Sequence, residues 1–142
     1  MIAKTSKTSR INAWLGTGIV LLHLLIVVPH GVAHSNLQIE MNRWQNVYIL
    51  VVINLLPLLA AFLIWKRPRA GYWLLLISMT GSLLFGVYYH FISPGSDNAM
   101  TLPEHPWSHT FQWTAVLLAI TELTGIVIGV LGLRNKIPAT SV

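Results

Sequence analysis

Four long runs of apolar residues, almost free of charged side chains, dominate this 142-residue sequence. A helix needs about 20 predominantly apolar residues to cross the hydrocarbon core of a bilayer. The runs cover residues 13–33, 47–65, 71–92 and 111–133. None of them shows the alternation of apolar and polar residues that is typical of a barrel strand. The sequence therefore predicts an all-α integral membrane protein, with one transmembrane four-helix bundle over residues 1–142.

The composition supports a membrane environment. Only 9% of the residues are charged and 54% are hydrophobic, whereas about 25% of a soluble domain is charged. The formal net charge of +5 comes from short basic clusters beside the apolar runs. No basic and aromatic surface for nucleic acid is visible, so nucleic acid is not an expected partner. Cysteine is absent, which excludes disulfides and thiolate metal sites.

The Lys and Arg residues predict how the spans are oriented. Basic clusters precede the first run, separate the second from the third and follow the fourth, while the other two loops contain only Arg43. Such clusters collect on the cytoplasmic side, so both termini are predicted to be cytoplasmic. The expected location is a multi-pass position in a cytoplasmic or inner membrane. The clustered residues are Lys4, Lys7, Arg10, Lys66, Arg67, Arg69, Arg134 and Lys136.

The N-terminus has an alternative interpretation. Its basic segment, apolar stretch and small residues at positions 31–33 also fit a secretory signal peptide. Cleavage after Ala33 would leave three spans that begin at His34. The apolar stretch is longer than a usual signal peptide and contains His23, so the four-span interpretation is favoured.

Small residues predict how two of the helices associate. Close helix packing in lipid depends on such residues at intervals of four. They occur in the third and fourth runs as Ser78, Ser82, Gly86, Thr121, Gly125 and Gly129. The two faces are expected to pack within the bundle. Contact with a second copy in a homodimer, or with another membrane subunit, is the alternative for one of them.

Five of the six histidines fall at the predicted outer ends of the spans. His30 and His34 are four residues apart, so they project from one side of a helix. His90 ends the third run, and His105 and His109 precede the fourth. Imidazole is a common metal ligand. The sequence predicts a metal site for Cu or Zn at His30, His34 and His90, with His109 as the next candidate.

Other outer-side groups bear on the same site. Asp97, Glu40 and Glu104 are carboxylates that could bind the metal or orient a ligand. A haem between His30 or His34 and His90 is a less favoured cofactor, because no other haem signal is present. The alternative is that these histidines bind no metal and are solvated at the membrane interface, where amphipathic side chains are common.

Three polar residues lie near the middle of the apolar runs. Glu122 is the one acidic residue inside a run, and His23 and Asn54 lie at a similar depth. A charge at the bilayer centre costs at least about 2.5 kcal/mol, so these side chains are expected to face inward as a buried polar network. Such a network either relays protons or fixes the arrangement of the helices.

The sequence does not specify a reaction. No nucleotide-binding, nucleophile-elbow or H-E-x-x-H pattern is present, and enzyme activity is left undecided. Three hypotheses follow: a metal-binding or cofactor-binding membrane subunit, a structural or assembly subunit of a membrane complex without a metal, and a proton-coupled carrier or pH sensor that uses Glu122 and the histidines.

Overall fold

The computed structural model describes residues 7–134, and every regular element in that range is a helix. In chain order the elements are α1 (Lys7–Asn36), α2 (Arg43–Tyr48), η1 (Ile49–Leu55), α3 (Leu56–Lys66), α4 (Pro68–Val87), η2 (Tyr88–Ile92) and α5 (Ser108–Arg134). The segments η1 and η2 are π-helical, and they continue α2 into α3 and extend α4.

Four of the helical stretches are long and apolar enough to cross a membrane. They are Arg10–Asn36, Arg43–Lys66, Pro68–Ile92 and Ser108–Arg134. Each contains one of the predicted runs and is a few residues longer than it. Large apolar side chains such as Leu25, Phe62 and Leu84 are exposed on these helices, as a lipid-facing surface requires. The prediction of an all-helical protein with four helices long and apolar enough to span a membrane is confirmed for the described residues.

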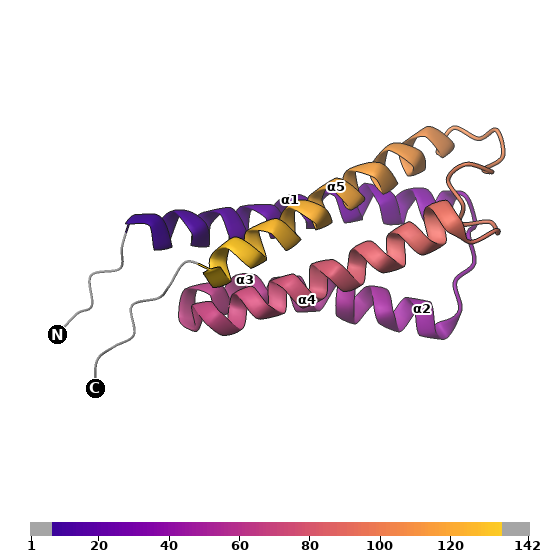
Figure 1. The fold of residues 1–142 in the computed structure, drawn as a ribbon. Coiled ribbons are helices and arrows are strands. Elements are labelled where there is room, and N and C mark those ends of the chain that lie inside the picture. The colour runs from indigo at the N-terminus through magenta and orange to yellow at the C-terminus, as the bar shows by residue number, and fades with distance from the viewer. Residues whose placement is uncertain (1–6, 135–142) are drawn as a thin grey trace.

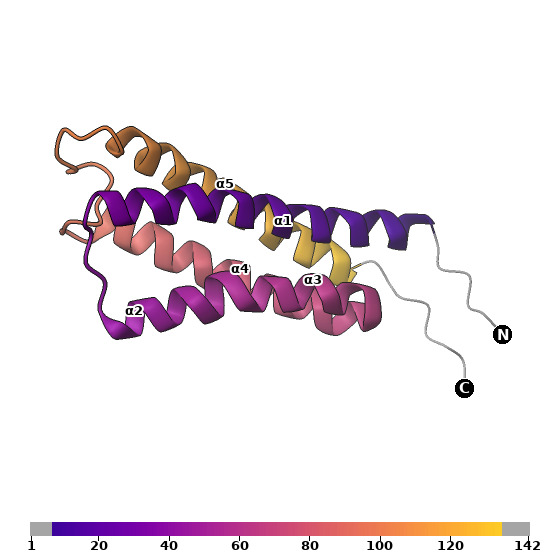
Figure 2. The same ribbon diagram turned by 180° about the vertical axis from the view of Figure 1, so that it is seen from behind.

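The four stretches run antiparallel (Figure 1). The beginning of α1, the α3–α4 connection and the end of α5 lie at one end of the molecule, which we call the turn end. The end of α1, the beginning of α2, η2 and the beginning of α5 lie at the other, which we call the histidine end (Figure 2). Which end faces the cytoplasm stays a prediction, and Lys4 and Lys136 lie outside the described residues.

Glycines of α5 let this helix pack closely on α4, as the small-residue pattern predicted. A Cβ atom at Gly125 would lie 2.8 Å from the Cγ of Met79, and one at Gly129 would lie 3.1 Å from the Cβ of Leu76. The glycines therefore face large side chains of α4. Ser78 and Ser82 of α4 are fully buried.

Pro57 disturbs the hydrogen bonds of the second span. In an α-helix the carbonyl of Ile53 would accept from the N–H of residue 57, and proline has none. The preceding segment η1 is π-helical, an irregularity that often marks functional positions. The Ile53 carbonyl instead accepts a hydrogen bond from His23 Nε2 at 3.1 Å. A polar group is thereby exposed to the interior of the bundle.

The connection between η2 and α5 folds over the histidine end. Gln112 donates to the carbonyl of Ala99 at 2.8 Å, and the N–H of Ala99 donates to the carbonyl of His90 at 2.9 Å. Ala99 packs with Phe111 and Ala33 in a small apolar cluster. These contacts hold the preceding residue pair, Asp97 and Asn98, against the helix ends.

Candidate metal centre

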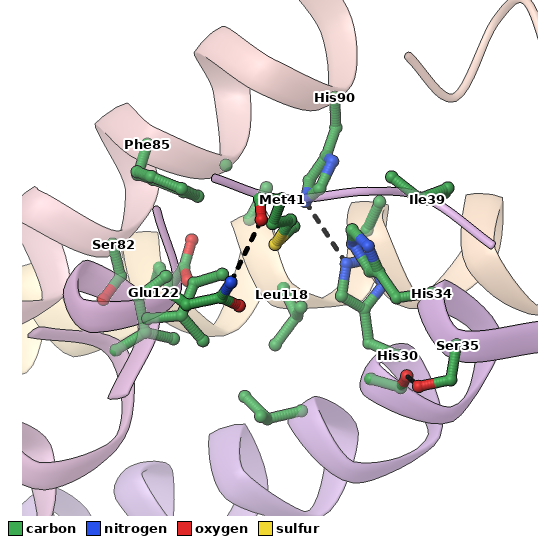
Figure 3. Close-up of a pocket in the computed structure, with 18 residues that line it drawn as sticks. His30, His34, Ser35, Ile39, Met41, Ser82, Phe85, His90, Leu118 and Glu122 are labelled. Atoms are coloured by element: carbon green, nitrogen blue, oxygen red, sulfur yellow. Dashed lines mark hydrogen bonds between the residues drawn. The ribbon is translucent and has the colours of Figure 1, made fainter. Parts of the chain in front are cut away.

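Three histidines meet at the histidine end. One ring nitrogen of each of His30, His34 and His90 lies within 4.8 Å of the others. The first two come from the last turns of α1, and His90 comes from η2 (Figure 3). His30 and His90 are 7% and 6% exposed, so water does not separate these imidazoles as it would at an open interface. The spacing of four in α1 places two rings on one helix face, and η2 supplies the third.

The hydroxyl of Thr114, on α5, contacts His30 and determines which ring nitrogen of His30 is assigned the hydrogen. The Thr114 hydroxyl donates its single hydrogen to a backbone carbonyl of its own helix, at 2.6 Å for Thr110 or 3.0 Å for Phe111. The same oxygen lies 2.9 Å from His30 Nδ1. We assign the hydroxyl hydrogen to the Thr110 carbonyl, the shortest of these contacts; with this assignment the oxygen accepts and Nδ1 of His30 donates. In the neutral ring the other nitrogen, Nε2, then carries a lone pair.

Asp97 fixes His90 in the same way. Nδ1 of His90 lies 3.2 Å from the Asp97 backbone carbonyl and 3.1 Å from the carboxylate oxygen Oδ1. A carbonyl can only accept, so Nδ1 of His90 is the donor. Nε2 of the neutral His90 ring therefore also carries a lone pair.

The Nε2 atoms of His30 and His90 are in contact. His30 Nε2 and His90 Nε2 are 3.2 Å apart. With these hydrogen assignments, neither nitrogen has a hydrogen to donate while both rings are neutral, and the contact is then between two acceptors. A cation between the nitrogens removes this conflict, either as one added proton or as a metal ion. A tetrahedral metal with nitrogen ligands at 2.0–2.1 Å places two of them about 3.3 Å apart.

His34 completes the group and also contacts Asp97. Its Nε2 lies 3.3 Å from Asp97 Oδ1. Within the described residues its buried Nδ1 has no hydrogen-bond partner, and neither Asp97 carboxylate oxygen has a well-directed hydrogen bond. A carboxylate beside two imidazoles favours hydrogens on the ring nitrogens that face it. The opposite ring nitrogens are then free to bind a metal.

The side chain of Phe111 packs against all three imidazole rings. Its ring centroid lies 4.7 Å from that of His30, 4.9 Å from that of His34 and 5.2 Å from that of His90. The phenylalanine is fully buried. A rigid apolar contact beneath all three rings limits their rotation, which keeps the ligand nitrogens near one another.

The structure does not bring His109 into this group. His109 is exposed, as are His105, Glu40 and Glu104. His109 lies at the histidine end, as predicted, but its side chain does not turn toward the three histidines. Two residues correspond to about 200° around a helix, so α5 cannot turn both Phe111 and His109 toward the trio. Of the three predicted carboxylates, the structure brings only Asp97 to the site.

Glu122 and His23 approach each other deeper in the bundle, and both are buried. Glu122 Oε1 lies 3.9 Å from His23 Nδ1, which is too far for a hydrogen bond. Asn54 does not join them. Its amide donates to the carbonyl of Ile49 in its own helix at 2.7 Å. The backbone carbonyl of Ile53, left without an α-helical donor by Pro57, takes the predicted place of Asn54 beside His23.

Sequence reasoning did not single out Thr114 or Phe111 as site residues. Both lie on one face of α5, three residues apart, and this spacing was the available signal. Comparison of the chain with family models, with curated proteins and with solved structures finds no match. The geometry of the site is therefore the basis for any functional assignment.

Proposed function

We propose that this chain is a multi-pass membrane protein that binds one transition-metal ion, Zn²⁺ or Cu, through His30, His34 and His90. The observation that carries the proposal is the convergence of three imidazole nitrogens within 4.8 Å, two of them in a 3.2 Å contact whose assigned hydrogens leave a lone pair on each. Thr114 and Asp97 determine this assignment by accepting from the opposite nitrogens of the same rings. Neutral imidazoles held this way are arranged to share a cation.

The surrounding groups match those of protein metal sites. Metal-bound histidines usually donate their other ring N–H to a carboxylate, a carbonyl or another acceptor, which orients the ring and raises its basicity. Thr114 does this for His30, and Asp97 does it for His90. The proposed ligand atoms are Nε2 of His30, Nε2 of His90 and Nδ1 of His34. Three imidazoles without a thiolate suit Zn²⁺ or Cu.

Three protein ligands leave one position of a tetrahedral metal open. Structural zinc sites are normally closed by four protein ligands, whereas functional sites keep a position for water or a substrate. The trio borders a cavity of about 420 Å³, so a fourth ligand has room. The arrangement favours a single ion over a haem, because the centroids of the His30 and His90 rings are only 4.9 Å apart, which leaves no slot for a macrocycle.

A metal analysis tests the proposal. Detergent-purified protein, loaded with Zn²⁺ or Cu²⁺ and passed over a desalting column, is expected to retain about one ion per chain. The double variant His30→Ala/His34→Ala should lose it. His109→Ala is the matched control, since it removes an exposed histidine of the same end and should retain the ion.

Two results decide against the metal. If neither metal is retained by the wild-type chain, the metal site is refuted, and the structural-subunit and pH-sensor hypotheses take its place. If the double variant retains as much metal as the wild type, the trio is not the site. Circular dichroism of each variant shows whether the helices persist, so that loss of metal is not confused with unfolding.

A further inference from the structure

A cavity of about 420 Å³, partly open to the outside, lies between the helices next to the histidine trio (Figure 3). His30, His34 and His90 line one end of it, and Ser82 and Glu122 line the other. Pockets for small organic ligands have volumes of about 300–1,000 Å³. The cavity is therefore large enough for a compact molecule in addition to a metal ion.

Apart from Ser35 and Asn46, the side chains that line the rest of the cavity are mainly apolar. Val27 of α1, Ile49 and Ile53 of η1, and Leu118 of α5 contribute aliphatic side chains. An ion that moved along such walls would lose its hydration without compensation. Beyond the cavity, toward the turn end, Met79 packs against Gly125. The interior there is filled by the apolar cluster that includes Met79, Leu75 and Tyr72. The cavity is thus better suited to a neutral organic molecule than to ion passage.

The deep end offers unused hydrogen-bonding groups. Ser82 is fully buried, and its hydroxyl oxygen has no hydrogen-bond partner among the described residues. Glu122 is 3% exposed and makes no hydrogen bond with His23 across their 3.9 Å separation. Buried polar atoms are normally paired. A ligand oxygen at this end would supply the missing partner.

Gly86 keeps the space between the two polar ends open. A Cβ atom at this position would lie 3.8 Å from Cδ2 of His90 and 3.9 Å from Oε2 of Glu122. These are ordinary contact distances, so one methyl group fits, while a larger side chain would extend into the cavity. Gly86 lies on α4, which also carries Ser82 one turn earlier.

We propose that this cavity binds a neutral, lipid-soluble ring compound with oxygen atoms on opposite edges, of the hydroquinone or quinone class. The apolar walls hold the ring, one oxygen hydrogen-bonds with Ser82 and Glu122, and the other oxygen faces the histidine trio. A neutral ligand suits the membrane interior, where a charge is costly. The proposal goes beyond the metal site, because the walls, Ser82 and Glu122 hold such a ring whether or not a metal is bound.

Duroquinol, a tetramethyl hydroquinone, is a suitable probe, and durene is its matched control because it has the same methylated ring without oxygens. Both are titrated by calorimetry, without oxygen, into the full-length protein in nanodiscs, and into empty nanodiscs to subtract partitioning into lipid. Saturable binding of one duroquinol per chain is expected, with durene at least tenfold weaker. The titration is repeated after removal of metal with a chelator, and binding is expected to persist.

Three variants locate the bound probe. Gly86→Leu should abolish saturable binding by filling the cavity, whereas Gly18→Leu adds the same side chain where nothing lies within 4 Å and should leave binding intact. Ser82→Ala removes one hydrogen bond to the probe and should weaken binding about two- to tenfold. It should not lower the thermal midpoint, because the hydroxyl has no partner in the described part of the protein.

Several outcomes would overturn the inference: no saturable duroquinol binding, equal binding of durene, or full binding by Gly86→Leu. If Gly86→Leu fails to fold, the comparison with durene and the Ser82→Ala titration decide. In the wild-type protein, absence of probe binding with normal metal retention refutes the cavity ligand alone. Absence of metal retention with normal probe binding refutes the metal site alone.

Discussion

Replacement of Thr114 by valine tests the hydrogen-bond logic of the metal centre directly. Valine keeps the shape of threonine but removes the oxygen that accepts from His30 Nδ1 at 2.9 Å. His30 can then move its hydrogen to Nε2 and donate to His90 Nε2, which lies 3.2 Å away. The conflict between the two lone pairs disappears in the metal-free protein. The metal ion therefore relieves less repulsion in the variant, and the metal affinity of the variant should be lower than that of the wild type.

The expected size of the effect follows from the role of the hydroxyl. Loss of a group that orients a metal-bound histidine lowers metal affinity about 10- to 100-fold, which corresponds to about 1.4–2.7 kcal/mol. A metal present at 100 times its dissociation constant stabilises the wild-type fold by about 2.7 kcal/mol. At the same metal concentration, about 1.3–2.3 kcal/mol of this stabilisation should be lost in Thr114→Val, about half of it for a 10-fold and most of it for a 100-fold loss of affinity.

Competition with a chromophoric chelator measures the affinity, and thermal unfolding with and without metal measures the stabilisation. Thr124→Val is the matched control. It makes the same change on the same helix, at an exposed threonine whose hydroxyl donates to the Ile120 carbonyl of its own helix. Its metal affinity should equal that of the wild type.

Wild-type affinity in Thr114→Val would refute the assignment of hydrogens in the trio. An equal loss in Thr124→Val would show that the change acts through the helix and not through His30. If the metal-free Thr114→Val protein unfolds at a much lower temperature than the metal-free wild type, the hydroxyl serves mainly to stabilise the fold, and the proposed conflict between lone pairs is wrong.

Further predictions concern the carboxylate, the packing and the topology. Asp97→Asn keeps the size of the side chain but removes its charge beside two imidazoles, and the chelator assay should show about 10- to 100-fold weaker metal binding. Gly125→Leu should destabilise the bundle by about 1–3 kcal/mol or more, because even a Cβ there would lie 2.8 Å from Met79; thermal unfolding in detergent measures this loss, and an unchanged midpoint would contradict the packing. Reporter fusions at Lys136 and within residues 94–104 should report opposite sides of the membrane, and the four-span topology is wrong if they agree.

The spans were predictable because hydropathy and length alone decide which helices can cross a bilayer. His30 and His34 were predictable as a pair because a spacing of four fixes their common face without knowledge of the fold. His90 followed from depth, since it ends a span on the same side. For these residues, position along the helix axis and local periodicity carry the necessary information.

Direction around the helix axis was the quantity that the sequence did not supply. His109 and Asn54 have suitable depths, but one faces outward and the other bonds within its own helix. Asn54 also lies in a π-helical segment, where the periodicity of an α-helix does not apply. The roles of Thr114 and Phe111 depend on how α5 turns toward α1, and helix packing decides that.

The π-helical turn η2 makes the trio sensitive to chain length. Such a turn holds one residue more than an α-helical turn, so it corresponds to a single codon inserted into an otherwise regular helix. Removal of Tyr89, which precedes His90 in this turn, would let the turn close as an α-helix. The side chains that follow would then rotate by about 100° relative to α4. A one-codon deletion could thus separate His90 from His30 and His34 while all three histidines remain in the sequence.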